Sequence, residues 1–299
     1  MSIRVNPDIA PDLLADLQLL QSQQNTANLQ LASGQSINFP SDDPAGAAGL
    51  VLNHAQASQI DQFQKNISSL ETTLQIGDST MTSVVEAFTQ AITLGVEGGN
   101  SSLSASDLQA IAQQVQGIRN QILGLANTSS EGVFLFSGTD VGTQPYTLNS
   151  AAPDGVAYNG NNGVDSIQLS SGQAVQINIP GSQVFTNSAG DVFGALNQLI
   201  TALQSGTGIA AANQAMDQAF NVLDTQRLFF GTTLAQVQST GNFLSNDQLQ
   251  LSTQASQLSG ADLASALTTL DQTQLASQAL LESAGRTLSL PSLLDFLTT

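Results

Sequence analysis

The chain has 299 residues, enough for an ample core and for more than one domain, but only 9% of them are charged and the formal net charge is −18. Proteins bind nucleic acids and anionic membrane surfaces through clusters of basic residues. The five basic residues of this chain are scattered singly, which excludes both kinds of partner: Arg4, Lys65, Arg119, Arg227 and Arg286. Cysteine is absent and no apolar run approaches ~20 residues, so we expect no disulfide framework, no thiolate metal site and no membrane insertion.

The first predicted helix covers residues 12–33. Its apolar residues recur in steps of three and four, as along one face of a coiled-coil helix: Leu13, Leu17, Leu20, Ala27 and Leu31. Gln24 interrupts this seam, and Gly34 follows where a left-handed residue usually ends a helix. We expect the seam to pack against other helices.

A long helix is predicted to begin within Phe39-Pro-Ser-Asp-Asp-Pro-Ala-Gly-Ala-Ala48. Pro44 suits the first helical position because its missing N–H has no partner there, and Asp42 or Asp43 can cap the free N–H groups that follow. Beyond this start, an almost wholly apolar seam alternates steps of three and four: Ile60, Phe63, Ile67, Leu70, Leu74, Gly77, Met81, Val84, Phe88 and Ala91. A helix over 44–96 would be about 80 Å long, so we expect a rod rather than one compact globule.

The next segment predicts an antiparallel helical hairpin. Gly98-Gly99-Asn100 makes a turn, and Ser104-Ala-Ser-Asp107 resembles a capping box with Asp in place of the usual Glu or Gln. The helix that follows has a similar seam: Leu108, Ile111, Val115, Ile118, Ile122 and Leu125. A short turn between two helices favours antiparallel packing.

Short strands are predicted between residues 133 and 190. Val133-Phe-Leu-Phe136 is a short apolar run. The alternating residues of a half-buried strand are Val175, Ile177 and Ile179. Asn159-Gly160 and Asn162-Gly163 are turn or hairpin dipeptides between Val156–Tyr158 and Ile167–Leu169. We therefore expect a small β-rich insert.

Helical patterns resume after the insert, first with Val192, Phe193, Leu196, Leu199 and Leu203. A longer seam then contains Leu223, Phe230, Leu234, Val237, Leu244, Leu251, Ala255 and Leu258, with Arg227, Gly241 and Gln248 between them. Ser259-Gly-Ala-Asp262 resembles a second box-like helix start. The last helix stops before Pro291, and its seam contains Leu263, Leu267, Leu270, Leu281, Ala284 and Leu288.

These segments predict a mainly α fold, namely a long antiparallel helical rod with paired N- and C-terminal coiled-coil helices and a small inserted β-rich domain. We expect three domains, formed by residues 1–40 with 260–299, by 41–132 with 190–259, and by 133–189. The terminal segments have Gln and Ser at core positions, so we expect them to be poorly ordered alone and to gain packing partners from neighbouring copies.

The segment from Leu31 to Ala48 resembles the signature of the bacterial flagellin family, in which a Ser-Gly and an Asp-Asp-Pro join the terminal helix to the rod. Asn66, Asn127 and Gly132-Val-Phe-Leu-Phe-Ser-Gly138 resemble the same family. Phe-Ser-Gly-Thr139 and Ser292-Leu-Leu-Asp-Phe-Leu297 are closer to its hook-associated members than to flagellin. The similarity covers residues 1–138 and 190–299 and is weak in the insert.

The resemblance implies a structural protein of the flagellum, without catalysis or cofactors, that is exported by the flagellar type III apparatus without a cleavable signal peptide. It implies self-assembly in a ring outside the cell. The further partners it implies are the first hook–filament junction protein, flagellin and an export chaperone. The two terminal seams would then make the assembly contacts, and the insert would face outward.

The residue types offer little for an enzyme. His54 is the only histidine, so histidine-based triads and metal clusters reduce to one candidate, and we expect a surface or packing role for it. Asp42 and Asp43 could form an acid–base pair, but capping fits their position before Pro44 better. The glycines of the insert form no phosphate-binding motif.

Three functions stay open from the sequence: a hook–filament junction protein, flagellin itself, and an extracellular adhesin or enzyme that acts through the β-rich insert. For the third function, the insert after Gly138 offers few ionic side chains: Asp140, Asp154 and Asp165.

Overall fold

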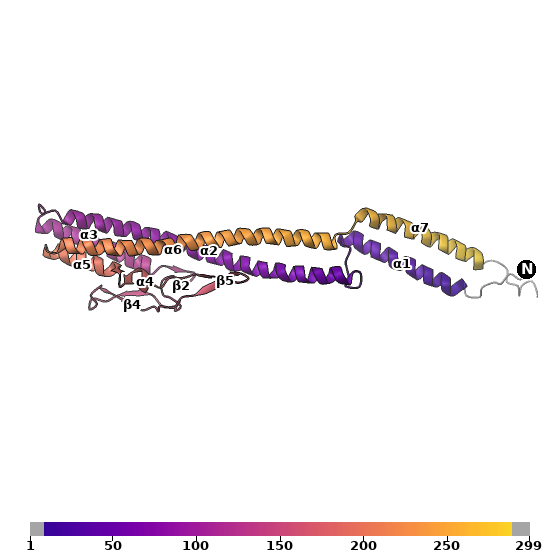
Figure 1. The fold of residues 1–299 in the computed structure, drawn as a ribbon, viewed down its shortest axis with the longest axis horizontal. Helices are drawn as coiled ribbons and strands as arrows, with labels where there is room; N and C mark the ends of the chain where they lie inside the picture. Colours follow the sequence, from indigo (N-terminus) through magenta and orange to yellow (C-terminus); the bar gives the residue numbers. More distant parts are fainter. Residues whose placement is uncertain (1–8, 289–299) are drawn as a thin grey trace, which may run out of the picture. The chain divides into compact units, whose positions relative to one another are not determined.

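The structure is a computed structural model that describes residues 9–288. It divides into two compact units, one formed by residues 1–58 and 247–299 and the other by residues 59–246. The described residues form helices α1 (Ile9–Ser33), α2 (Pro44–Gly98), α3 (Ala105–Ala126), α4 (Gly181–Val184), α5 (Val192–Ser205), α6 (Ile209–Ser259) and α7 (Leu263–Leu288) (Figure 1). The predicted mainly helical fold with an inserted β-rich region is therefore confirmed.

The seam of α2 runs through the centre of the unit formed by residues 59–246. Every predicted seam position from Ile60 to Ala91 is buried, including Gly77. The matching buried positions of α6 are Leu223, Phe230, Val237 and Leu244. Because the buried positions of both helices follow the same heptad spacing, α2 and α6 pack as an antiparallel coiled-coil pair in this unit.

One glycine favours a single register of this helix pair. The Cβ of an alanine at Gly77 would stand 2.5 Å from Cε1 of Phe230, so Gly77 is a notch that receives the Phe230 ring. At Gly241, a Cβ would make only an ordinary contact of 3.4 Å with Cγ2 of Ile67. A shift by one heptad would place Phe230 against a full-sized side chain, so the notch at Gly77 favours one register.

The capping box predicted at the start of α3 is confirmed. Ser104 Oγ accepts a hydrogen bond from the Asp107 N–H at 3.3 Å, and Asp107 Oδ2 accepts one from the Ser104 N–H at 3.0 Å. The hydrogen bonds from Ser104, its hydroxyl first and its N–H second, lower the pKa of the Asp107 carboxyl. Because the folded pKa is depressed, the resulting stabilisation is present above the carboxyl's unfolded pKa and is lost as pH falls through the folded value.

Ser104→Ala is expected to lower the free energy of unfolding by about 1 kcal/mol, the usual contribution of an N-cap side chain. The pKa of Asp107 should rise toward its ordinary value, because the hydroxyl donor is gone. Chemical denaturation measures the first effect and an NMR titration of the carboxyl the second. Ser101→Ala, in the preceding turn, is the control and should change neither; an unshifted Asp107 in the Ser104 variant would contradict the assignment.

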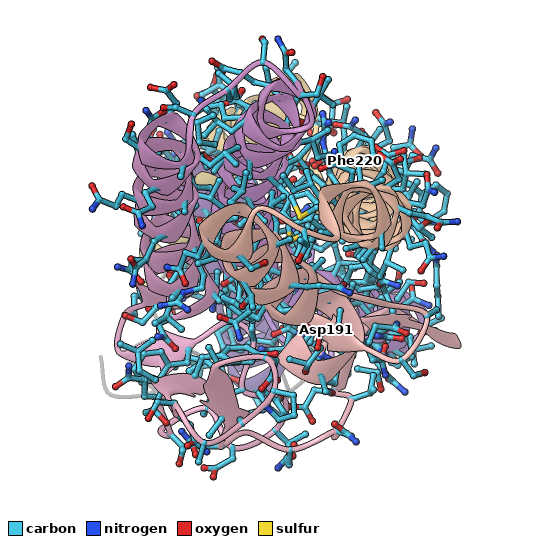
Figure 2. The ribbon with its side chains drawn as sticks, turned by 90° about the vertical axis from the view of Figure 1, so that its left-hand side faces the viewer. Asp191 and Phe220 are labelled. Atoms are coloured by element: carbon cyan, nitrogen blue, oxygen red, sulfur yellow. The ribbon has the colours of Figure 1, made fainter. Side chains whose placement is uncertain are left out.

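α5 begins with a partly buried aspartate. Asp191 Oδ1 accepts a hydrogen bond from the Gly194 N–H at 2.9 Å, so it caps this helix (Figure 2). Burial raises the pKa of the Asp191 carboxyl, and the hydrogen bond from Gly194 opposes that effect. The preceding residue, Gly190, lies against α6 just before Phe220, where a Cβ would stand 2.7 Å from the carbonyl oxygen of Gln218. A side chain at Gly190 would therefore push the start of α5 away from α6.

The strands of the described residues pair in chain order as four two-stranded antiparallel sheets. Their bounds are β1 (Ser129–Ser130), β2 (Val133–Phe134), β3 (Tyr146–Leu148), β4 (Val156–Tyr158), β5 (Ser166–Ser170), β6 (Gln173–Gln176), β7 (Thr186–Asn187) and β8 (Gly190–Asp191). Glu131 and Gly132 join β1 to β2 with φ of 53° and 84°, the two positive values that a type I′ turn requires.

Of the two alternatives predicted for the Asn-Gly dipeptides, a turn or a hairpin between Val156–Tyr158 and Ile167–Leu169, the hairpin does not form. β4 pairs with β3, and β5 pairs with β6. The two Asn-Gly dipeptides instead lie in the loop of residues 159–165, which joins the two sheets. Asn161 Oδ1 in this loop accepts a hydrogen bond from the Thr139 N–H at 2.8 Å, so the loop packs against the segment before β3 rather than closing a tight turn.

An aromatic cluster joins the insert to α5. The ring centroid of Tyr146, on β3, lies 5.2 Å from that of Phe193 and 5.7 Å from that of Phe185, and all three side chains are fully buried. Burial raises the pKa of the Tyr146 hydroxyl. The Asn127 side chain accepts from the Tyr146 N–H at 2.8 Å and donates to the Tyr146 carbonyl at 2.9 Å. The end of α3, β3 and α5 therefore share one core.

Candidate assembly interface

The unit formed by residues 1–58 and 247–299 contains both terminal helices, α1 and α7, which lie side by side (Figure 1). Gly34 follows α1 with φ +70°, as expected for a residue that ends a helix. An antiparallel bridge then pairs Gln35 with Gly260, and beside it the Ser36 N–H donates to the Ser259 carbonyl at 2.6 Å. Backbone hydrogen bonds thus tie the segment after α1 to the segment before α7.

The residues predicted to start the long helix are Asp42, Asp43 and Pro44. Pro44 is the first residue of α2, and Asp43 Oδ1 accepts a hydrogen bond from the Ala45 N–H at 3.0 Å. Asp42 Oδ2 instead accepts from the N–H groups of Asn38 and Phe39, at 3.0 and 2.8 Å. The two neighbouring carboxylates therefore have different tasks, because Asp42 closes the turn that precedes the helix.

The capping box predicted at Ser259–Asp262 does not form, and only Asp262 caps the helix that follows. The Ser259 hydroxyl donates to the Ala255 carbonyl at 2.8 Å, so Ser259 completes α6. Asp262 alone caps α7, where its Oδ1 accepts from the Ala264 and Ser265 N–H groups, both at 3.1 Å. Ser259 cannot serve as the cap because α7 begins only at Leu263.

The seam predicted for the first helix is the more buried face of α1. Ala27 is buried, and the half-buried members are Leu13, Leu17, Leu20 and Leu31. Other leucines of the helix are exposed: Leu14, Leu19 and Leu29. α1 therefore has apolar side chains beyond the face that α7 covers.

The predicted seam of α7 runs along the edge of its more buried face, and three of its leucines are exposed. Leu263, Leu267 and Leu281 are 51%, 52% and 56% exposed, whereas Leu270 is half-buried. The side chain of Leu288 lies outside the described residues. The more buried face consists of Ala266, Leu270, Thr273, Ser277, Leu280 and Ala284. The predicted seam includes Leu270 and Ala284 of this face, but it omits Ala266 and Thr273, whose side chains are small or polar.

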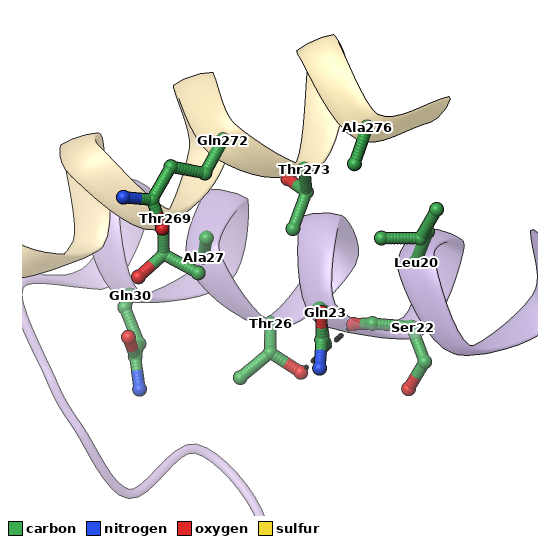
Figure 3. Close-up of a pocket in the computed structure, with 10 residues that line it drawn as sticks. All are labelled: Leu20, Ser22, Gln23, Thr26, Ala27, Gln30, Thr269, Gln272, Thr273 and Ala276. Atoms are coloured by element: carbon green, nitrogen blue, oxygen red, sulfur yellow. Dashed lines mark hydrogen bonds between the residues drawn. The ribbon is translucent and has the colours of Figure 1, made fainter. Parts of the chain in front are cut away.

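A polar groove of about 510 Å³ lies between α1 and α7 (Figure 3). The residues that line it are Leu20, Ser22, Gln23, Thr26, Ala27, Gln30, Thr269, Gln272, Thr273 and Ala276. None of these side chains titrates near neutral pH, so the groove offers no acid, base or nucleophile pair for catalysis. Its small and amide side chains leave the contact between the two helices loosely filled.

Sequence reasoning also missed Asn53, which is buried in the same unit with 5% of its surface exposed. Its Nδ2 donates to the Leu251 carbonyl of α6 at 3.0 Å. Extending the α2 seam backward by one heptad from Ile60 places Asn53 in the core, which is the signal that could have found it. A buried, satisfied asparagine favours one register of the two helices.

Other chemistry has little support in the described part of the chain. His54 is exposed on α2. Between residues 9 and 288, no three His, Cys, Asp or Glu side chains are grouped to hold a metal ion. None of the helices in that range combines the length and hydropathy that crossing a membrane requires.

Two family models match this chain. The bacterial flagellin N-terminal helical region matches residues 9–140, and the bacterial flagellin C-terminal helical region matches residues 213–294. Flagellar hook-associated protein 3 of Salmonella typhimurium is 27% identical over 277 residues, which are 84% of this chain and 86% of that protein. Flagellin of Bacillus subtilis is 26% identical over 296 residues, which are 93% of either chain.

The fold is similar to a solved structure as well. The flagellar junction protein FlgL from Legionella pneumophila superposes with a TM-score of 0.59 at 18% identity, covering 71% of this chain and 100% of that one. The family models match the two helical halves, which contain α1 and α7 and the segments that join them to the long helices. These matches identify the chain as a member of the bacterial flagellin family, in the branch that contains flagellar hook-associated protein 3.

Proposed function

We propose that this protein is a structural component of the bacterial flagellum and forms the junction ring between the hook and the flagellin filament. The observation that carries the proposal is the pair of terminal helices, which lie in the family-matched regions and keep leucines exposed on α7. The relatives named hook-associated protein 3 and junction protein FlgL, each aligned over more than two thirds of the chain, support the junction over the filament.

In this proposal the protein has no catalytic activity and no cofactor, and it acts by binding other proteins. Its partners are further copies of itself in the ring, the first hook–filament junction protein, flagellin, and a chaperone that holds it before export. The terminal segments 1–40 and 260–299 form the assembly domain. Residues 41–132 with 190–259 form the helical domain, and residues 133–189 form an outer module.

The exposed face of α7 is the surface that we propose contacts neighbouring copies. Leu263, Leu267 and Leu281 border the more buried face of the helix, and each is more than half exposed. An apolar stripe that is wider than the part covered in the single chain has enough apolar surface for a second packing partner. Burial of leucine side chains would contribute about 1.5–3 kcal/mol each, which favours assembly over the free subunit.

The double variant Leu267→Ser/Leu281→Ser is expected to block assembly while the subunit keeps its fold. Both leucines are more than half exposed, so their replacement should change the free energy of unfolding by no more than about 0.5 kcal/mol each. Circular dichroism with thermal unfolding measures the fold, and complementation of a deletion strain measures filament growth. Leu148→Ser, at an equally exposed leucine of β3, is the control and should restore filaments.

Deletion of the gene in its host tests the function itself, with electron microscopy of the cells and an assay of flagellin in the medium. Hooks without filaments, together with flagellin released into the medium, are expected for a junction protein. Missing filaments with no other flagellin in the medium would make this chain the filament subunit. Normal flagella would overturn both assignments.

A further inference from the structure

The loop between β4 and β5 contains two Asn-Gly pairs, Asn159-Gly160 and Asn162-Gly163. In such a pair, the glycine nitrogen can attack the side-chain Cγ of the asparagine, so that a succinimide ring closes and ammonia leaves. Water then opens the ring at either carbonyl carbon and gives aspartate or isoaspartate. Glycine favours this attack because it has no Cβ to obstruct the approach.

The second pair is held in an unreactive state. The Gly163 N–H donates to Asn161 Oδ1 at 2.9 Å, so the attacking nitrogen keeps its proton engaged. The Ser182 hydroxyl donates to Asn162 Oδ1 at 2.5 Å, which restrains rotation of the side chain that must be attacked. Both bonds must break before this ring can close.

In the first pair, Asn159-Gly160, fewer of the reacting groups are engaged in hydrogen bonds. Between residues 9 and 288, no hydrogen-bond acceptor is within reach of the Gly160 N–H. The Asn159 side chain is exposed, and only its Nδ2 is held, by Thr147 Oγ1 at 3.1 Å and by the Gln144 carbonyl at 3.5 Å. Among the described residues, neither the attacking nitrogen nor the Oδ1 of the amide is therefore engaged in a hydrogen bond.

Packing keeps this glycine in place. A Cβ on Gly160 would stand 2.6 Å from Tyr158 Oη and 2.7 Å from the Ser137 carbonyl oxygen. The Tyr158 hydroxyl itself donates to the carbonyls of Phe136 and Asn161, so it cannot move aside freely. A larger residue at position 160 would disturb the loop, and the reactive dipeptide is thus a consequence of how the loop packs.

We propose that Asn159 is a site of spontaneous deamidation and that the neighbouring Asn162 is protected from it by the fold. The reaction replaces an amide that donates two hydrogen bonds by a carboxylate that donates none, so the contact with the Gln144 carbonyl is lost and the Thr147 hydroxyl must change from acceptor to donor. In the isoaspartate form the main chain also gains a carbon beside β4. The insert of an ageing protein therefore acquires additional negative charge and a weakened β3–β4 sheet.

The test compares the two asparagines within one sample. Purified full-length protein is kept in mildly alkaline buffer, and the peptides that contain each asparagine are followed by mass spectrometry and an isoaspartate methylation assay. Asn159 is expected to react about tenfold faster than Asn162, because a hydrogen bond must break before the Gly163 nitrogen can attack. In concentrated urea the two rates should become equal. Equal rates in the folded protein, or a faster reaction at Asn162, would overturn the proposal.

Two variants test whether local hydrogen bonds or the general mobility of the loop set the deamidation rate at Asn159. Thr147→Val removes an acceptor that holds the Asn159 amide, and it is expected to raise the rate at Asn159 several-fold while the rate at Asn162 stays the same. Asn159→Gln removes the reactive asparagine and should also leave Asn162 unchanged. If Thr147→Val accelerates both sites equally, local hydrogen bonding does not control the reaction and the assignment is wrong.

Discussion

Replacing Phe193 with alanine is expected to lower the free energy of unfolding by about 3–5 kcal/mol, the usual cost of truncating a fully buried phenylalanine. The Phe193 ring is fully buried and lies 5.2 Å from the ring of Tyr146 and 5.8 Å from that of Phe185, centroid to centroid. Its removal leaves a cavity at the point where α5 meets the insert, and the surrounding rings cannot close that cavity without losing contacts with one another.

Chemical denaturation followed by circular dichroism measures the change at Phe193. Phe243→Ala is the matched control, because this phenylalanine of α6 is 64% exposed and its truncation should change stability by no more than about 0.5 kcal/mol. Similar losses in the two variants would show that the aromatic cluster does not stabilise this unit. Near-ultraviolet circular dichroism should also lose intensity in the Phe193 variant alone, since the packing of Tyr146 changes.

Gly77→Ala is expected to lower the free energy of unfolding by about 1–3 kcal/mol, although alanine is the better helix former. The new Cβ would stand 2.5 Å from Cε1 of Phe230. The Phe230 ring cannot turn away freely, because it lies 6.2 Å from the ring of Phe136 and 5.3 Å from that of Phe229. Either the ring or the helix must move, and both are packed.

Gly117→Ala is the control for the substitution at Gly77. Gly117 also lies within a helix, but a Cβ there would meet nothing within 4 Å, so alanine should raise stability by up to about 1 kcal/mol. The double variant Gly77→Ala/Phe230→Leu should recover part of the loss, since the smaller side chain leaves room for the methyl group. If Gly77→Ala is as stable as Gly117→Ala, Phe230 does not fill the space that a Cβ at position 77 would occupy.

The long helices could be predicted from sequence because they depend on a single pattern, the heptad spacing of apolar residues. From Ile60 to Ala91, large apolar residues recur at heptad spacing, and every one of these positions is buried. On α7 the same pattern gives a seam of which Leu263, Leu267 and Leu281 are exposed, while smaller residues such as Ala266 and Thr273 are buried. Apolar spacing shows that a face packs against something, but the sequence does not say whether the partner is the same chain.

The insert was harder to predict because its pairing depends on contacts between distant residues. Asn-Gly dipeptides favour two-residue hairpin turns, so the sequence left open a hairpin of β4 with β5 that the structure does not form. The Asn161 side chain instead bonds Thr139, which is 22 residues earlier in the chain, and this contact has no local signature. The different roles of Asp42 and Asp43 could not be separated for a local reason. Either carboxylate can cap a helix that starts at Pro44, and the fold of the turn over residues 38–42 decides that Asp42 bonds Asn38 and Phe39 instead.

The pairing of the two ends of the chain has a consequence for the order of folding. Asn53 bonds the Leu251 carbonyl 198 residues later, and Gln35 pairs with Gly260. Closing loops of this length costs conformational entropy before the contacts form, so this unit is expected to fold slowly. In a chain that emerges N-terminus first, whether from the ribosome or from an export channel, α1 has no folding partner until almost the whole polypeptide has followed. The terminal unit closes last.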